Sequence, residues 1–365
     1  MILTTRNIMT ARSFFLILTG ALLCTSATVR AATVGEMHRI AHTTSAAIRD
    51  AKHSDALRVT VWYPAMANAV EMPLTVGPPS QPLFDAGTAA TDAPFAPGRH
   101  SVILLSHGFG GSARMVAWLG TALARTGDVV IAVDHPGNNG RDPMTMAGGV
   151  LVWDRAVDLR AALMAMQSDP VIGQHMDVHR LGVAGFSMGG FTALLTAGGR
   201  ADIQHFLQFC HTHPTDNTCA PQAEAPDQTM ATREHALTLE PMASLVKHDS
   251  DDYAIPGIKA VFVMAPGGIE AIDPATLRNM KVPVSILLGD VDPVAPPVSN
   301  GNLAATLIPH ATLKTLHDVG HYDFLANCTD AGRQQVPSCT HLRVPQQTTH
   351  ATAIMQAEAF FAKNL

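Results

Sequence analysis

The stretch that decides the fold is Leu181-Gly182-Val183-Ala184, followed directly by Gly185-Phe186-Ser187-Met188-Gly189-Gly190. It places a Gly-x-Ser-x-Gly pentapeptide between an apolar, strand-like run and a helix-like stretch over residues 191–197. A serine at such a turn has a strained backbone, which pushes its hydroxyl out of the sheet. The glycines leave room where strand and helix cross, and the N–H groups that open the helix can stabilise a negative charge. The stretch therefore predicts a nucleophile, half of an oxyanion hole and a sheet covered by helices.

Outward from this turn, strand-like and helix-like runs alternate along the chain. Continuous apolar runs are typical of buried parallel strands. Apolar runs or runs rich in β-forming residues occupy residues 57–63, 101–106, 128–133, 259–264, 282–288 and 311–316. Apolar residues at helical spacing occupy residues 115–126, 152–167 and 348–363. This alternation predicts an α/β fold with a mostly parallel central sheet and helices on both faces.

Two segments interrupt the alternation. Residues 64–98 are rich in proline and longer than an ordinary loop, so we expect part of them to form a hairpin or a rim of the functional site. Residues 198–256 are polar, rich in histidine and contain proline. We interpret them as a helical cap inserted over the strand ends. The alternative is a disordered loop, against which the apolar cluster Phe206-Leu207-Gln208-Phe209 argues.

The N-terminal residues 1–31 have the features of a secretory signal peptide. Arg6 and Arg12 form a basic start, an apolar run follows over residues 13–29, and Val29-Arg30-Ala31 offers small residues for cleavage. The alternatives are an uncleaved membrane anchor, for which the apolar run is short, and a lipoprotein acylated at Cys24. The signal-peptide interpretation predicts a periplasmic or secreted protein with one domain over residues 32–365.

The charge of the chain excludes some classes of partner. The formal net charge is −6, only 15% of the residues are charged, and no run of like charge occurs. Nothing here resembles the basic surface that binding to nucleic acid or to an anionic membrane requires. We therefore expect neither nucleic acid nor stable membrane insertion after signal cleavage.

Four cysteines remain once the signal peptide is removed. An even number in an exported protein favours disulfides, and the local pairing Cys210–Cys219 with Cys328–Cys339 is preferred among three possible pairings because each pair brackets a polar loop. The rival interpretation is a metal site, since Cys210-His211-Thr212-His213 is rich in ligands. No second cluster stands at a standard zinc spacing, so we predict no metal.

Three residues at predicted strand ends have the chemistry of a catalytic triad. Ser187, Asp292 and His321 fall at the carboxyl ends of predicted strands, in the chain order Ser, Asp, His that this type of sheet uses. A serine needs a base to attack a carbonyl, and the imidazole needs an acid to hold its tautomer. Asp290 competes for the role of Asp292, and His317 competes for that of His321. We expect Asp292 at the loop tip, and His321 because a glycine precedes it.

A second motif, His107-Gly108-Phe109-Gly110-Gly111, follows the predicted strand 101–106. Its glycines allow the backbone to approach a tetrahedral oxyanion closely. We predict that the N–H groups of Phe109 and Met188 form the oxyanion hole. His107 itself is expected to be structural and to bond within its own loop.

Taken together, these motifs resemble the α/β-hydrolase superfamily over residues 57–365. More narrowly, they are similar to bacterial dienelactone-hydrolase-like proteins related to platelet-activating-factor acetylhydrolase. The narrower resemblance rests on Val61-Trp62-Tyr63-Pro64 and Gly320-His321-Tyr322-Asp323-Phe324-Leu325 besides the turns already quoted. It implies a serine esterase without metal or organic cofactor. Dienelactone hydrolases themselves use a cysteine nucleophile, so a serine at position 187 favours ordinary carboxylic esters.

The sequence thus predicts an exported serine hydrolase that cleaves small or oligomeric carboxylic esters through an acyl-enzyme. The alternatives within enzymes are an amidase, a lipase or phospholipid acetylhydrolase, and a polyester or oligoester hydrolase. An alternative from another class is a hydrolase fold that binds ligands without catalysis, against which the complete set of motifs argues.

Overall fold

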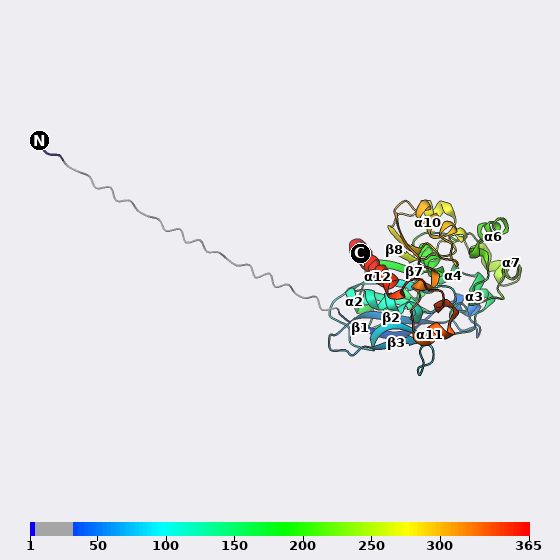
Figure 1. Ribbon diagram of the computed structural model, residues 1–365, viewed down its shortest axis with the longest axis horizontal. Coiled ribbons are helices and arrows are strands. Elements are labelled where there is room, and N and C mark those ends of the chain that lie inside the picture. Colours follow the sequence, from blue (N-terminus) through cyan, green and yellow to red (C-terminus); the bar gives the residue numbers. More distant parts are fainter. Residues whose placement is uncertain (4–31) are drawn as a thin grey trace. The chain divides into compact units, whose positions relative to one another are not determined.

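A computed structural model describes residues 1–3 and 32–365 of the chain, and Figure 1 shows the elements of the larger part. The signal peptide predicted over residues 1–31 falls almost wholly on residues 4–31, which lie outside the described residues. Within the described residues, no helix combines the length and the apolar character needed to cross a membrane.

A single mixed sheet of 11 strands forms the centre of this part. In spatial order its main path is β10 (Ala311–Leu316), β9 (Val284–Gly289), β8 (Ile258–Met264), β7 (Met176–Phe186), β5 (His100–Ser106), β6 (Val129–Val133), β2 (Ala56–Ala65), β1 (Thr33–His42), β4 (Phe84–Thr91) and β11 (Asn327–Cys328). β3 (Met72–Val76) pairs with β4 off this path. All neighbours from β10 to β6 are parallel, whereas β2 is antiparallel to both β6 and β1. The predicted mostly parallel sheet is therefore confirmed.

Helices cover both faces of the sheet. α4 (Asp154–Ser168) and α5 (Met188–Thr196) pack on one face, and α2 (Ala117–Thr126) and α12 (Gln346–Asn364) pack on the other. The remaining helices are α1 (Thr44–Arg49), α3 (Met146–Val150), α6 (Ile203–Thr212), α7 (Met230–Leu237), α8 (Met242–Leu245), α9 (Pro274–Arg278), α10 (Gly301–Leu307) and α11 (Asp330–Gln335). The four covering helices include the three that the apolar spacing predicts.

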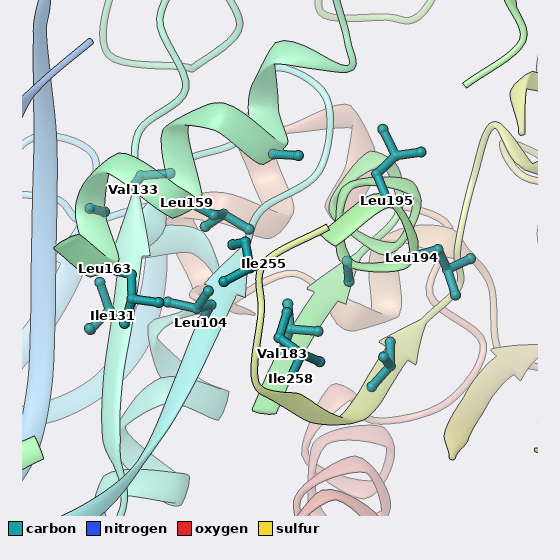
Figure 2. Close-up of a cluster of buried hydrophobic side chains, with 14 of the residues drawn as sticks. Leu104, Ile131, Val133, Leu159, Leu163, Val183, Leu194, Leu195, Ile255 and Ile258 are labelled. Carbon is teal, nitrogen blue, oxygen red and sulfur yellow. The ribbon is translucent and has the colours of Figure 1, made fainter. Parts of the chain in front are cut away.

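The continuous apolar runs form strands because both of their faces are buried. In β5, Leu104 contacts the cluster beneath α4 and α5, while its neighbours Ile103 and Leu105 belong to the cluster beneath α2 and α12. Figure 2 shows Leu159 and Leu163 of α4 lying over Leu104 and Ile131. Side chains of a strand alternate between its two faces, so an uninterrupted apolar run supplies both layers of core at once.

The two segments that interrupt the alternation both contain regular structure. Within residues 64–98, β3 and β4 form an antiparallel hairpin that extends the sheet beyond β1. Residues 198–256 contain α6, α7 and α8. Cys210 pairs with Cys219 and Cys328 pairs with Cys339, with Cα–Cα distances of 5.5 and 5.9 Å. This is the local pairing that the sequence favours.

Candidate active site

Ser187 stands at a sharp turn between β7 and α5, where its backbone has a φ of 55° and a ψ of −122°. This left-handed φ is unusual for a residue with a side chain. The turn is fastened to the next strand, because the Ser187 N–H donates to the Met264 carbonyl at 3.0 Å. A Cβ on Gly185 would overlap the Gly189 carbonyl, and a Cβ on Gly189 would overlap the Ser106 carbonyl. Close backbone packing therefore requires both glycines of the pentapeptide.

The structure brings Ser187, His321 and Asp292 into one hydrogen-bonded line. His321 Nε2 lies 2.8 Å from Ser187 Oγ, and His321 Nδ1 lies 2.7 Å from Asp292 Oδ2. Asp292 follows β9, and His321 opens the 3₁₀ helix His321–Phe324 that comes after β10. With Nδ1–H donating to the carboxylate, Nε2 is left to accept the serine proton.

The carboxylate of Asp292 is held from both sides. Its Oδ1 accepts hydrogen bonds from the N–H groups of Val294 and Ala295, each at 2.8 Å. The side chains of His321 and Asp292 are 4% and 1% exposed. Because both side chains are buried and their polar atoms are hydrogen-bonded, the imidazole of His321 is held in its orientation toward Ser187.

The competing residues form a separate pair at the surface. His317 Nδ1 lies 2.7 Å from Asp290 Oδ2, and the His317 side chain is 85% exposed. The hydrogen bond to Asp290 raises the pKa of His317, and the same bond lowers the pKa of Asp290. Neither residue is hydrogen-bonded to Ser187, whereas Asp292 and His321, which the sequence favours, form the line to the serine.

The loop after β5 brings a second backbone segment to the serine. A Cβ on Gly108 would lie 3.2 Å from the Ser187 Cβ, and Gly110 has a φ of 62°. Among the described residues, neither the Phe109 N–H nor the Met188 N–H donates a hydrogen bond to another protein group. The two predicted oxyanion donors are therefore free to bind an oxygen.

His107 bonds within its own loop, with Nδ1 at 2.6 Å from the Gly108 carbonyl, and its Nε2 accepts from the His135 N–H at 3.2 Å. Burial lowers the pKa of His107 to about 3, with a further contribution from the Arg155 cation. The ring is therefore neutral at physiological pH, which suits a structural role.

Sequence reasoning missed a buried polar network beneath this loop. The Arg155 guanidinium donates to the His107 carbonyl and, at 3.0 Å, to Thr192 Oγ1 of α5. Asn138 Oδ1 accepts from the Gly110 N–H at 3.0 Å. Arg155 thus ties the predicted oxyanion loop to the helix that follows Ser187. The sequence carried no clear signal for this role, because Arg155 is only one of several charged residues in α4.

A second part of the network lies against β6 and α4. Asp158 pairs with Arg49 at 2.6 Å and with His135 Nδ1 at 2.8 Å, and all three side chains are almost fully buried. Burial alone would raise the pKa of Asp158, but the Arg49 cation and the hydrogen bonds from Arg49 and His135 together outweigh burial and lower it. His135 Nε2 then reaches Ser106 Oγ at 2.9 Å, directly before the oxyanion loop.

Two cavities meet at Ser187. The first cavity has a volume of about 80 Å³ and lies between the serine and the helices α6 and α7. Its lining is mainly apolar and includes Ile203, Phe206, Leu207, Met230 and Leu237. Residues 198–256 therefore supply much of its wall.

The second cavity is larger, with a volume of about 560 Å³, and has a more polar lining. His321, Tyr322, Glu224, Arg114 and Ser338 lie along it. Residues of β3 and of the loop closed by Cys328–Cys339 contribute to this wall. The two cavities share Phe109, Ser187, Gln222 and Val294.

The rival metal interpretation loses its thiolate ligand, because Cys210 is bonded to Cys219. No group of three or more His, Cys, Asp or Glu residues within 1–3 and 32–365 is arranged to hold a metal ion.

Parts of this chain are similar in sequence to known proteins. A family described as PET hydrolase-like matches residues 83–237. The cutinase est2 of Thermobifida alba is 36% identical over 107 residues, and the cutinase cut1 of Thermobifida fusca is 32% identical over 120 residues. These alignments cover 29% and 32% of this chain and 32% and 34% of the cutinases, so the chain matches about a third of the length of these relatives.

A solved structure extends the likeness over most of the chain. The ferulic acid esterase from Streptomyces cinnamoneus superposes with a TM-score of 0.60 at 20% sequence identity. The superposition covers 93% of this chain and 92% of the esterase chain. It confirms the predicted α/β-hydrolase fold.

Proposed function

We propose that the chain is a serine hydrolase that cleaves carboxylic esters, in keeping with its α/β-hydrolase fold and with the match of residues 83–237 to a PET hydrolase-like family. The observation that carries the proposal is the line from Ser187 Oγ to His321 Nε2, at 2.8 Å, and from His321 Nδ1 to Asp292, at 2.7 Å. The cutinase and esterase names of the similar proteins support the same class of reaction.

In the proposed first step, Ser187 Oγ attacks the ester carbonyl carbon while its proton passes to His321 Nε2. The carbonyl oxygen becomes an oxyanion and accepts hydrogen bonds from the N–H groups of Phe109 and Met188. Loss of one such donor typically lowers turnover about 10²- to 10³-fold. Asp292 stabilises the imidazolium that forms.

The tetrahedral intermediate then collapses. The bond from the carbonyl carbon to the alcohol oxygen breaks, and His321 gives its proton to that oxygen. A water molecule next transfers a proton to His321 and attacks the acyl carbon, and the bond to Ser187 Oγ breaks with return of the proton. The acid is released and the serine is restored.

A fluorophosphonate probe tests the nucleophile directly. We expect the probe to label the native protein but not Ser187→Ala. The control Ser250→Ala, which changes an exposed serine, should be labelled like the native protein. Hydrolysis of 4-nitrophenyl butyrate should follow the same pattern. A well-folded protein that is neither labelled nor active would favour a ligand-binding role for the fold.

Polyester hydrolysis is the second candidate, favoured by the match to a PET hydrolase-like family. Against it, Ser187 is only 9% exposed and lies at a cavity partly walled by α6 and α7. A serine so covered is better placed for soluble esters than for a flat polymer surface. The two candidate functions are separated by comparing the release of soluble acid from a polyester film with the turnover of a soluble diester. Turnover of the diester without release from the film would favour soluble esters.

The narrower resemblance to dienelactone-hydrolase-like and platelet-activating-factor-acetylhydrolase-like proteins remains a prediction. A lactone and a short-chain phospholipid, assayed beside the 4-nitrophenyl esters, test it. Hydrolysis of simple esters alone would leave only the superfamily assignment. An amide substrate in the same panel tests the amidase alternative.

We also propose that the protein is exported and that residues 198–256 act as a cap that selects the substrate. The two disulfides support export, since such bonds persist in oxidising compartments. Intact-mass analysis after alkylation without reductant should find no free thiol among these four cysteines in exported protein. Four alkylated thiols would contradict the proposal.

A further inference from the structure

Arg233 of α7 has an unusual environment for a cation. Its Nε and Nη2 atoms are buried and have no hydrogen-bond partner among the described residues. It forms no ion pair with a described carboxylate, since the adjacent Glu234 pairs instead with His211 at 2.9 Å. Burial lowers the pKa of Arg233, and no acidic side chain offsets this effect.

This guanidinium lines the first cavity beside the reacting centre. It is the only charged residue among the described residues that form the cavity wall, which is otherwise mainly apolar. The Arg233 Cζ lies 5.7 Å from the ring centroid of Phe109, the residue whose N–H is a proposed oxyanion donor. The aromatic face supports the cation but leaves its N–H groups unsatisfied.

An arginine remains charged in proteins, and a buried charge without a partner is costly. The two unpartnered atoms, Nε and Nη2, lie on one edge of the guanidinium. That edge presents two parallel N–H groups with the spacing of a carboxylate, which it binds in a bidentate manner. The missing partner is therefore an anion with two coplanar oxygens.

The position of His321 tells which half of an ester enters the first cavity. His321 must protonate the leaving alcohol, and it lines the second cavity but not the first. The alcohol accordingly departs through the second cavity. The acyl group occupies the first cavity, on the side of Met188 and Arg233.

We propose that this enzyme prefers esters whose acyl group carries a free carboxylate, that is, half-esters of dicarboxylic acids. The apolar wall holds the body of the acyl group, and Arg233 binds its terminal carboxylate through Nε and Nη2. The inference rests on the proposed esterase function, and it names the substrate class of that same site.

The test compares 4-nitrophenyl half-esters of adipic, suberic and sebacic acids with the neutral 4-nitrophenyl hexanoate, octanoate and decanoate. We expect the native protein to have a higher kcat/KM on at least one half-ester than on its neutral counterpart. In Arg233→Gln this ratio should fall about ten- to hundredfold, the usual range for a lost charged hydrogen bond. Arg233→Lys should recover only part of it, because an ammonium group cannot form the planar bidentate contact.

Two controls separate recognition from a structural role. Arg200→Gln changes another arginine of residues 198–256, whose side chain is 46% exposed, and should leave the ratio unaltered. The melting temperature of Arg233→Gln should equal or exceed that of the native protein, because the substitution removes an unpaired buried charge. A clear fall in melting temperature together with an unchanged ratio would assign Arg233 to structure and overturn the inference.

Binding provides a readout that does not need turnover. Calorimetry on Ser187→Ala should detect monomethyl adipate, suberate or sebacate binding more tightly than the matched methyl alkanoate, and the added Arg233→Gln change should abolish the difference. If the native protein hydrolyses the neutral esters but neither rate nor binding favours the half-esters, the inference fails and the esterase proposal stands. If no ester is hydrolysed at all, the proposed function fails first.

Discussion

The two cavities at Ser187 differ in size, polarity and origin. The first is about 80 Å³, mainly apolar and walled in part by residues 198–256, whereas the second is about 560 Å³, more polar and built from strand-end loops, β3 and the loop closed by Cys328–Cys339. They share the serine and the Phe109 loop, so one reacting centre serves both. Under the proposed function, reaction and selectivity have separate structural sources, and the two halves of an ester are selected by different parts of the chain.

The largest effect should come from the residue common to both cavities. Ser187→Ala removes the nucleophile, and we expect kcat to fall on the order of 10⁶-fold for every ester, whatever its acyl or alcohol group. Steady-state assays with a set of 4-nitrophenyl esters and a melting curve check this. A fall for some substrates and not others would mean that the cavities do not share one nucleophile.

The next effect concerns the acid that orients His321. Asp292→Asn should lower kcat about 10⁴-fold, because an amide does not hold the imidazole in the tautomer that accepts the serine proton. The control is Asp290→Asn, which alters only the exposed pair with His317 and should change kcat by less than about twofold. The reverse ranking of the two variants would move the acid to Asp290.

A smaller effect should distinguish the two cavities from each other. Leu207→Ala enlarges the first cavity, so kcat/KM for longer relative to shorter acyl chains should rise by about tenfold, the typical value of a methylene contact. Val76→Ala, in the wall of the second cavity, is the matched control and should leave the acyl preference unaltered. A panel of 4-nitrophenyl esters with graded chain length measures both. Equal shifts in the two variants would show that the acyl group is not confined to the first cavity.

The smallest effects should come from the disulfides, one beside each cavity. Replacing either pair by serines should lower the free energy of unfolding by about 2–3 kcal/mol, through the greater freedom of the unfolded chain.

Loss of Cys210–Cys219 should also alter acyl selectivity, since this disulfide fastens α6 to the segment that carries Thr218. Loss of Cys328–Cys339 should instead alter alcohol selectivity. Denaturant unfolding and the ester panels check the two parts, and an exchange of the two selectivity effects would contradict the assignment of the cavities.

The line through Ser187, Asp292 and His321 could be predicted from the sequence because each residue lies in the turn or loop that follows a predicted strand. Parallel strands bring their carboxyl ends to one edge, so local position along the chain translates into position in space. The expected position at the loop tip selected Asp292 over Asp290, and the glycine-rich motif and the helix start after Ser187 suggested Phe109 and Met188 as oxyanion donors.

Other features depended on partners remote in the chain. Arg155 reaches the His107 carbonyl across 48 residues, and Arg49 reaches Asp158 across 109. β1 was not predicted, because its run Thr33–His42 mixes polar and charged residues with apolar ones. Its place between β2 and β4 follows from strand pairing, which a local sequence pattern does not reveal.

The sequence by itself determined the fold class and the residue types at the strand ends, because burial follows from local composition and the parallel sheet follows from strands alternating with helices. Only the tertiary structure decided what surrounds those residues. It placed helices of residues 198–256 around the cavity at Ser187 and left Nε and Nη2 of Arg233 buried with no partner among the described residues. Whether a side chain is satisfied depends on every group packed around it, and those groups come from segments that meet only when the chain folds.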